Sequence, residues 1–309
     1  YNTAAFEQFA QNDGYYAKSI NGDAYSQEIK EETIALIKKD FGQVDMVIYS
    51  LAAPRRKAPD GVTYRSVLKT VDKEFTNQSI DLLTNELTPV TIPPATEEEI
   101  NDTIKVMGGE DWMLWMEALQ EADVLADGAK TVAYSYIGPE LTYPIYYDGS
   151  IGQAKQDLYR TADKINEHIQ GTEAYVAVNK AVVTQSSSAI PIVPLYISIL
   201  FKVMKELNLH EGCIEQMYRL VHDRLCVEGG VPTDENHLIR MDDYEMKPEV
   251  QEEVKKIWKK ISPENLTELT DIDGYWQEFY EIFGFRMEGV DYDADVNIQT
   301  SIPSIISAE

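Results

Sequence analysis

Apolar positions in the first part of the chain switch between helical and strand spacing. A helical pattern ends near Gly14, an extended run covers 16–20, a turn follows at Asn21–Asp23, a second helix covers 26–39, and an apolar strand covers 44–50. This alternation is typical of a doubly wound, mostly parallel sheet. Because the 44–50 strand is apolar along its whole length, we expect it to be central and covered on both faces.

The middle of the chain carries a polar insertion followed by further strand and helix patterns. Extended runs at 62–71 and 75–87 predict short hairpin strands. The later patterns predict helices at 97–107, 111–122 and 150–168, strands at 130–137 and 174–179, a small-residue loop at 184–189, and two helices separated near 210–212. These elements continue the α/β alternation.

The last part of the chain, from about residue 242, has helical patterns at 247–261 and 274–283 and is expected to be peripheral. No repeat or linker interrupts the chain. The sequence therefore predicts a single Rossmann-like α/β domain over 1–309 with helical elaborations. Within it we distinguish a first part at 1–60, a middle part at 104–225 and a helical C-terminal part at 240–309.

Composition narrows the classes of function. With 44% hydrophobic residues the chain can bury a large core, and its net charge of −26 opposes binding to nucleic acid or anionic lipid. The most apolar stretch, 189–201, holds two prolines and is too short to span a bilayer. The two cysteines indicate a reducing compartment, and we expect the cytoplasm. The four histidines show no metal-ligand spacing, so no metal is expected.

The candidate chemistry lies in a tyrosine-rich segment before the 150–168 helix. Tyr146 and Lys155 have eight residues between them, which would place them on opposite sides of one regular helix. The Asp148-Gly149 turn signal resolves this, because Tyr146 can lie on the entering loop while Lys155 projects from the helix. A tyrosine hydroxyl can hydrogen-bond an oxygen on which negative charge develops, and a nearby ammonium favours the polarised phenol. Tyr143 and Tyr147 could equally be packing residues.

The spacing of Tyr146 and Lys155 resembles the signature of the FabV-type enoyl reductases and the related trans-2-enoyl-CoA reductases. The resemblance covers nearly the whole chain. Similar segments occur at 106–112, 133–138, 178–180, 190–196, 200–205 and 210–216.

The resemblance implies NADH-dependent reduction of the 2,3-double bond of enoyl-CoA or enoyl-acyl-carrier-protein in fatty acid synthesis, by a monomer; NADPH is not excluded. It also implies that 1–60 form mainly the cofactor side and 104–225 mainly the substrate and catalytic side. Tyr146 would be the catalytic tyrosine and Lys155 its partner. The substrate side would comprise Tyr136, Val182, Val183 and Phe201. The cofactor side would comprise Asp23, Ala24, Ser50, Leu51 and Ala52, which follow predicted strands, where parallel sheets bind ligands.

One part of the family pattern is missing. The family opens with a strand, a glycine-rich turn and a helix that receives the pyrophosphate, whereas Gly14 is the only glycine here before Gly22. We therefore expect the chain to lack its first βα unit, and a non-catalytic truncated fragment stays an alternative. A short-chain ketoreductase is a second alternative, but it would have three residues between tyrosine and lysine.

Several candidates also have plain structural interpretations. Tyr136 could be a core aromatic residue with a satisfied hydroxyl. Val182, Val183 and Phe201 could be simple core residues. Lys180, which follows a predicted buried strand, could be a cation near the thioester or a lysine facing solvent.

Overall fold

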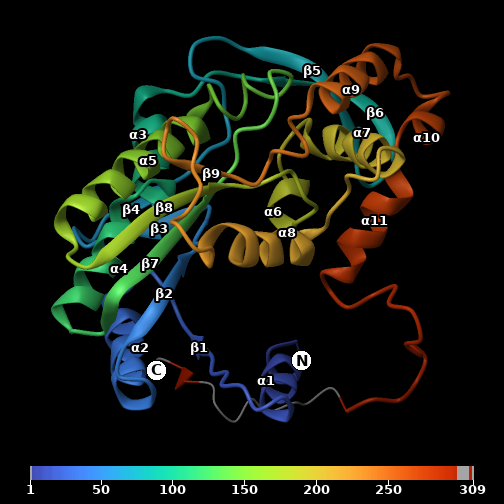
Figure 1. Cartoon of the computed structure of the whole chain (residues 1–309). Coiled ribbons are helices and arrows are strands. Elements are labelled where there is room, and N and C mark those ends of the chain that lie inside the picture. Colours follow the sequence, from blue (N-terminus) through green and yellow to red (C-terminus); the bar gives the residue numbers. More distant parts are fainter. Residues whose placement is uncertain (1, 298–305, 308–309) are drawn as a thin grey trace.

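Four parallel strands form the main sheet of the computed structural model, which describes residues 2–297 and the backbone of 306–307 (Figure 1). In spatial order the strands are β2 (Val44–Tyr49), β7 (Leu125–Ser135), β8 (Thr172–Val178) and β9 (Leu238–Arg240). All three neighbouring pairs run parallel. The predicted α/β class with a parallel sheet is confirmed.

Helices cover both faces of this sheet. On one face α4 (Glu110–Glu121) and α5 (Ser150–His168) pack against residues that include Ala133. On the other face α8 (Cys213–Leu220) packs against residues that include Val132. Successive side chains of a strand point to opposite faces, so the apolar run in β7 supplies both layers of the core that surrounds the sheet.

A second core lies beside the sheet, where α7 (Val193–Glu206), α9 (Pro248–Lys260) and α11 (Ile272–Glu281) pack with the hairpin of β5 (Phe75–Asp81) and β6 (Glu86–Ile92). The expectation of a peripheral C-terminal part is wrong. Charge-rich helices α9 and α11 contribute fully buried residues to this core, because their apolar positions recur on one face.

The remaining elements are short or contribute little to the two cores. They are α1 (Asn2–Asn12), β1 (Ile20–Asn21), α2 (Gln27–Asp40), β3 (Arg55–Lys57), β4 (Thr63–Arg65), α3 (Glu97–Met107), α6 (Gln185–Ser188), a π-helix (Val221–Leu225), α10 (Leu266–Leu269) and β10 (Ile306–Ser307). Of these, α2 packs Ile34 and Ile37 against the core of the sheet. Figure 1 shows α1 at the bottom, set apart from the sheet and its covering helices. β1 pairs with β10 and does not join the main sheet.

Several strand predictions need correction. Of the run expected at 16–20, only Ile20 lies in a strand, β1. The 44–50 strand was expected to be central, but among the described residues β2 is an edge strand, and Ile48 is 41% exposed. The apolar run of β2 reflects neighbours that partly cover both faces of the strand. Such cover says nothing of how many strands lie beside it in the sheet. β9 was not predicted, because its three residues follow a polar loop and are too few to show a period.

A buried hydrogen bond joins α4 to the sheet. The Trp112 side chain is fully buried, and its Nε1 donates to Thr131 Oγ1 of β7 at 2.9 Å. Thr131 Oγ1 in turn donates to the carbonyl of Val47 in β2 at 3.1 Å. One indole therefore fixes a helix and two strands.

Trp112→Ala is expected to lower the free energy of unfolding by about 3 to 5 kcal/mol, because it empties a core site and removes a partner of Thr131. Chemical unfolding followed by circular dichroism measures this loss. The control is Tyr15→Ala at a ring that is 73% exposed, expected to change stability by less than about 0.5 kcal/mol. Equal losses in the two variants would contradict the role given to Trp112.

Candidate active site

A cavity of about 220 Å³ lies at the carboxyl ends of β2, β7 and β8. It brings together Tyr136, Tyr146 and Lys155 from the predicted catalytic and substrate sets, and Ser50, Leu51 and Ala52 from the predicted cofactor set. Cavities at this edge of a parallel sheet are the usual ligand sites of doubly wound folds. The volume suits the reacting ends of two ligands better than a whole dinucleotide.

Tyr146 lies in the turn before α5, and Lys155 lies in the second turn of that helix, as the Asp148-Gly149 turn signal indicated. The turn packs tightly against the start of the helix. A Cβ added to Gly152 would lie 1.9 Å from the carbonyl oxygen of Tyr147 and 2.6 Å from that of Tyr146. Only glycine therefore lets the tyrosine-bearing turn lie this close to α5.

Burial sets the electrostatics of the pair. It raises the pKa of the Tyr146 hydroxyl to about 12, with a smaller contribution from Tyr159, and lowers the pKa of Lys155 to about 8. Lys155 Nζ donates to the carbonyl oxygen of Tyr134 at 3.0 Å. Among the described residues, none hydrogen-bonds the Tyr146 hydroxyl, which leaves a neutral phenol available to donate to a ligand.

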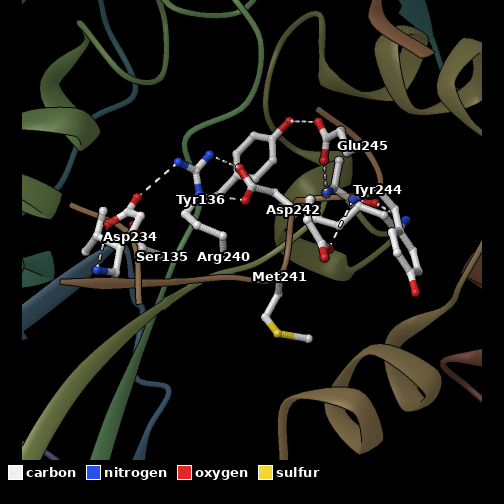
Figure 2. A network of polar contacts seen from close by, with 12 residues as sticks. Ser135, Tyr136, Asp234, Arg240, Met241, Asp242, Tyr244 and Glu245 are labelled. Atoms are coloured by element: carbon white, nitrogen blue, oxygen red, sulfur yellow. Dashed lines mark hydrogen bonds and ion pairs between the residues drawn. The ribbon is translucent and has the colours of Figure 1, made fainter. Parts of the chain in front are cut away.

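Tyr136 packs its ring edge-to-face on Tyr146, with the ring centroids 4.9 Å apart. Its hydroxyl donates to Glu245 Oε1 at 2.9 Å, as Figure 2 shows. Burial raises the pKa of Glu245, whereas hydrogen bonds from its neighbours act in the opposite direction. Sequence reasoning missed Glu245, which is 109 residues from Tyr136 and follows the unpredicted strand β9.

Lys180 does not face solvent, so the alternative weighed for it is wrong. It is 1% exposed and lines the cavity, and its Nζ donates to the carbonyl oxygen of Ala181 at 2.7 Å. Burial lowers its pKa, while nearby carboxylates such as Glu245 raise it. A buried lysine at this edge of the sheet requires such compensation.

The other predicted site residues are divided between the cavity and its surroundings. Val182 lines the cavity, Val183 lines a separate hollow, and Phe201 is fully buried in the second core. Asp23 and Ala24 are not among the described residues that line the cavity. Ala24 lies near α4, because its carbonyl oxygen accepts a hydrogen bond from Trp115 Nε1 at 3.1 Å.

The loop predicted at 184–189 contains the short helix α6 and supplies polar groups to the cavity. Thr184, Ser186 and Ser187 line it, together with the Ser50–Ala52 segment that follows β2. Thr184 caps α6, since its Oγ1 accepts from the Ser187 amide at 3.0 Å. The loop therefore adds small polar side chains to the residues that the strand ends supply.

Within the described part of the chain, no group of three or more histidine, cysteine or acidic side chains is placed to hold a metal ion. No helix there combines the length and apolar character that crossing a membrane requires.

Comparison with known proteins identifies the family. A family model described as the trans-2-enoyl-CoA reductase catalytic region matches residues 1–226. The chain belongs to this family. A second model, described as the enoyl reductase FAD binding domain, matches residues 233–296. The family resemblance read from the sequence is thus confirmed.

Relatives are similar over almost the whole chain. The trans-2-enoyl-CoA reductase [NADH] of Ruminiclostridium cellulolyticum is 55% identical, across 99% of this chain and 78% of the relative. The enoyl-[acyl-carrier-protein] reductase [NADH] of Coxiella burnetii is 53% identical, across 99% and 76%. The Treponema denticola trans-2-enoyl-CoA reductase, solved in complex with NAD, has a TM-score of 0.92 and 45% identity, across 96% and 74%. These relatives favour an enoyl reductase over a short-chain ketoreductase.

The segment that matches the flavin-named model does not fit a flavin in this structure. None of its described residues lines the cavity at the sheet edge. Its described residues border two hollows. The one beside Val183 also carries Glu211, Glu215, Glu278 and Glu281, which would repel a pyrophosphate. The one lined by Asn236 and His237 holds about 280 Å³, which is too small for a whole flavin dinucleotide. We therefore derive no step through a flavin.

The lowered pKa of Lys155 has a consequence for stability. Between pH 8 and its usual pKa of 10.5, the Lys155 side chain is protonated in the unfolded chain and neutral in the folded chain. Its contribution to the free energy of unfolding therefore rises with pH in this range. Lys155→Met removes this contribution. We expect the variant to exceed the wild type in stability at pH 7, with the advantage shrinking from about pH 8 to 10.5.

Denaturant unfolding of both proteins at several pH values measures the difference, in which the titration of all other groups cancels. A constant difference from pH 7 to 10.5 would show that Lys155 keeps an ordinary pKa in the folded chain.

Proposed function

We propose that this chain reduces the 2,3-double bond of trans-2-enoyl thioesters with NADH. The observation that carries the proposal is the Tyr146 hydroxyl, which has no hydrogen-bond partner among the described residues and lines the same cavity as Lys155 and Ser50–Ala52. Relatives are named as NADH enoyl reductases for both CoA and acyl-carrier-protein substrates. A site that held these groups far apart would have favoured a non-catalytic fragment.

When bound, NADH supplies a hydride for the β-carbon of the enoyl group. Negative charge then develops on the thioester oxygen, and Tyr146 donates a hydrogen bond to it. The ammonium form of Lys155 stabilises the charge that Tyr146 takes up as it polarises. A proton reaches the α-carbon from the Tyr146 hydroxyl or from water. Burial keeps the Tyr146 phenol neutral, so its hydroxyl retains the proton that a hydrogen-bond donor needs.

The walls of the cavity divide between the two ligands. On the cofactor side, Ser50, Leu51 and Ala52 would hold the nicotinamide end, and Asp23 and Ala24 the adenine end. On the substrate side, Tyr136 and Val182 would contact the thioester and acyl chain. Val183 and Phe201 would support that wall from behind. Apolar Ile190, Val193 and Ile197 complete the cavity lining and suit an acyl chain.

The biological setting is also part of the proposal. A reductase for enoyl thioesters fits fatty acid synthesis, with CoA and acyl-carrier protein as the candidate thiol carriers. The free thiols of Cys213 and Cys226 fit the cytoplasm. We further propose a single domain that acts as a monomer.

Tyr146→Phe is expected to lower kcat for crotonyl-CoA reduction by about 10²- to 10³-fold, because it removes one hydrogen-bond donor to the developing charge. The decrease in NADH absorbance at 340 nm measures the rate. The matched control is Tyr147→Phe, since that ring is 38% exposed and does not line the cavity. We expect the control to retain wild-type kcat.

A Tyr146→Phe protein that keeps full activity would remove this residue from the mechanism. A wild-type chain that reduces neither crotonyl-CoA nor longer enoyl thioesters would reject the proposed function and favour a binding protein.

A further inference from the structure

A buried carboxylate lies directly behind the cavity. Glu245 is fully buried, and three donors converge on it. Tyr136 and Tyr196 donate their hydroxyls to Oε1 at 2.9 and 2.6 Å, and the Ala181 amide donates to Oε2 at 2.6 Å. Two of the three donors, Tyr136 and Ala181, belong to residues that line the cavity.

The backbone that carries Glu245 is firmly anchored. Figure 2 shows the Arg240 guanidinium between Asp234 and Asp242, with Arg240 Nη2 2.6 Å from Asp242 Oδ2. The amide of Met241 donates to the carbonyl oxygen of Val178, at the end of β8, at 2.9 Å. Glu245 is thus tied to the sheet edge from which the cavity opens.

Counting donors fixes the direction of the tyrosine hydroxyls. Because three donors converge on Glu245, the arrangement fits a carboxylate, which only accepts hydrogen bonds. Tyr136 and Tyr196 then each give it their single proton. The Tyr136 oxygen then presents only lone pairs to the cavity. Of the two cavity tyrosines in edge-to-face contact, Tyr146 alone keeps a proton for the thioester oxygen.

We propose that Glu245 is a positioning residue: it holds the Tyr136 hydroxyl and ring in one orientation, and that ring supports Tyr146 as the donor to the thioester. This inference rests on the proposed function. Glu245 itself lies outside the cavity lining and acts through Tyr136.

Glu245→Gln keeps the size of the side chain and reverses its hydrogen-bonding pattern. The Ala181 amide requires an acceptor, so the new carboxamide oxygen turns to it and the NH₂ group turns to the tyrosines. The Tyr136 hydroxyl then accepts a hydrogen bond from this NH₂ group, and its own O–H bond turns toward the cavity. The variant thus changes hydroxyl direction at constant volume.

The kinetic test is a double-mutant cycle on crotonyl-CoA reduction. We expect Glu245→Gln to lower kcat/KM by about 10- to 100-fold, mainly through kcat, and by less than about 3-fold when Tyr136 is already Phe. Tyr196→Phe is the control, because it removes a donor to the same oxygen from outside the cavity. It should leave kcat within about 3-fold of wild type.

Two outcomes would overturn the proposal in favour of a structural network. One is an equal loss of kcat/KM from Glu245→Gln whether residue 136 is Tyr or Phe. The other is a loss of kcat in Tyr196→Phe as large as that in Glu245→Gln. If Glu245→Gln fails to fold, Tyr136→Phe supplies the test. Its kcat must fall less than that of Tyr146→Phe, because the Tyr136 hydroxyl does not donate to the substrate.

A measurement without turnover separates this inference from the proposed function. With ¹³C at the hydroxyl-bearing carbon of tyrosine, the Tyr136 resonance is assigned by its loss in Tyr136→Phe, and Glu245→Gln should shift it. An unmoved resonance overturns the inference. An inactive wild type whose Tyr136 resonance still depends on Glu245 would reject the reductase function and retain the contact.

Discussion

The parallel ladder between β7 and β8 is the constraint on which the site depends. Seven register pairs run from Ala129 opposite Thr172 to Ser135 opposite Val178. Both strands therefore end at the same height, and the residues that follow them, Tyr136 and Lys180, enter one cavity. The connection that makes the strands parallel must return along the sheet, and α5 forms that return. Because Tyr146 and Lys155 lie on this connection, the topology itself brings the proposed catalytic pair to the strand ends.

The same edge concentrates ionisable groups where water is scarce. Lys155 and Lys180 both have lowered pKa values because burial disfavours their charge, and burial raises the pKa values of Tyr146 and Glu245. Such groups cost stability unless they are hydrogen-bonded. Here each lysine donates to a backbone carbonyl and Glu245 accepts from three donors, whereas the Tyr146 hydroxyl has no partner among the described residues. Of these four groups, the one left unsatisfied is the one that the proposed reaction uses.

The sequence predicts those features that depend on residues close together in the chain, and it fails for those that depend on contacts between distant segments. The positions of Tyr146 and Lys155 were predictable because a turn signal and a helix lie between them. Glu245 was not, because no local pattern links it to a tyrosine 109 residues earlier and its strand has only three residues. The 44–50 strand was correctly predicted but wrongly placed, since apolarity reports cover on the faces of a strand and not the number of its neighbours. Lys180 was left undecided for a related reason: its burial depends on packing by α7 and α8.

The separation of eight residues between tyrosine and lysine has a physical consequence. On one helix the two side chains would share a single rigid support, whereas here each has its own. Lys155 is fixed by α5. Tyr146 is held on one side by the close contact of its turn with Gly152 and on the other by the Tyr136 ring. A donor on a turn needs such external support, because the turn has no regular hydrogen-bond ladder to fix the side chain. The buried carboxylate behind Tyr136 therefore belongs to the support of the active site, although it lies far away in the sequence and outside the cavity.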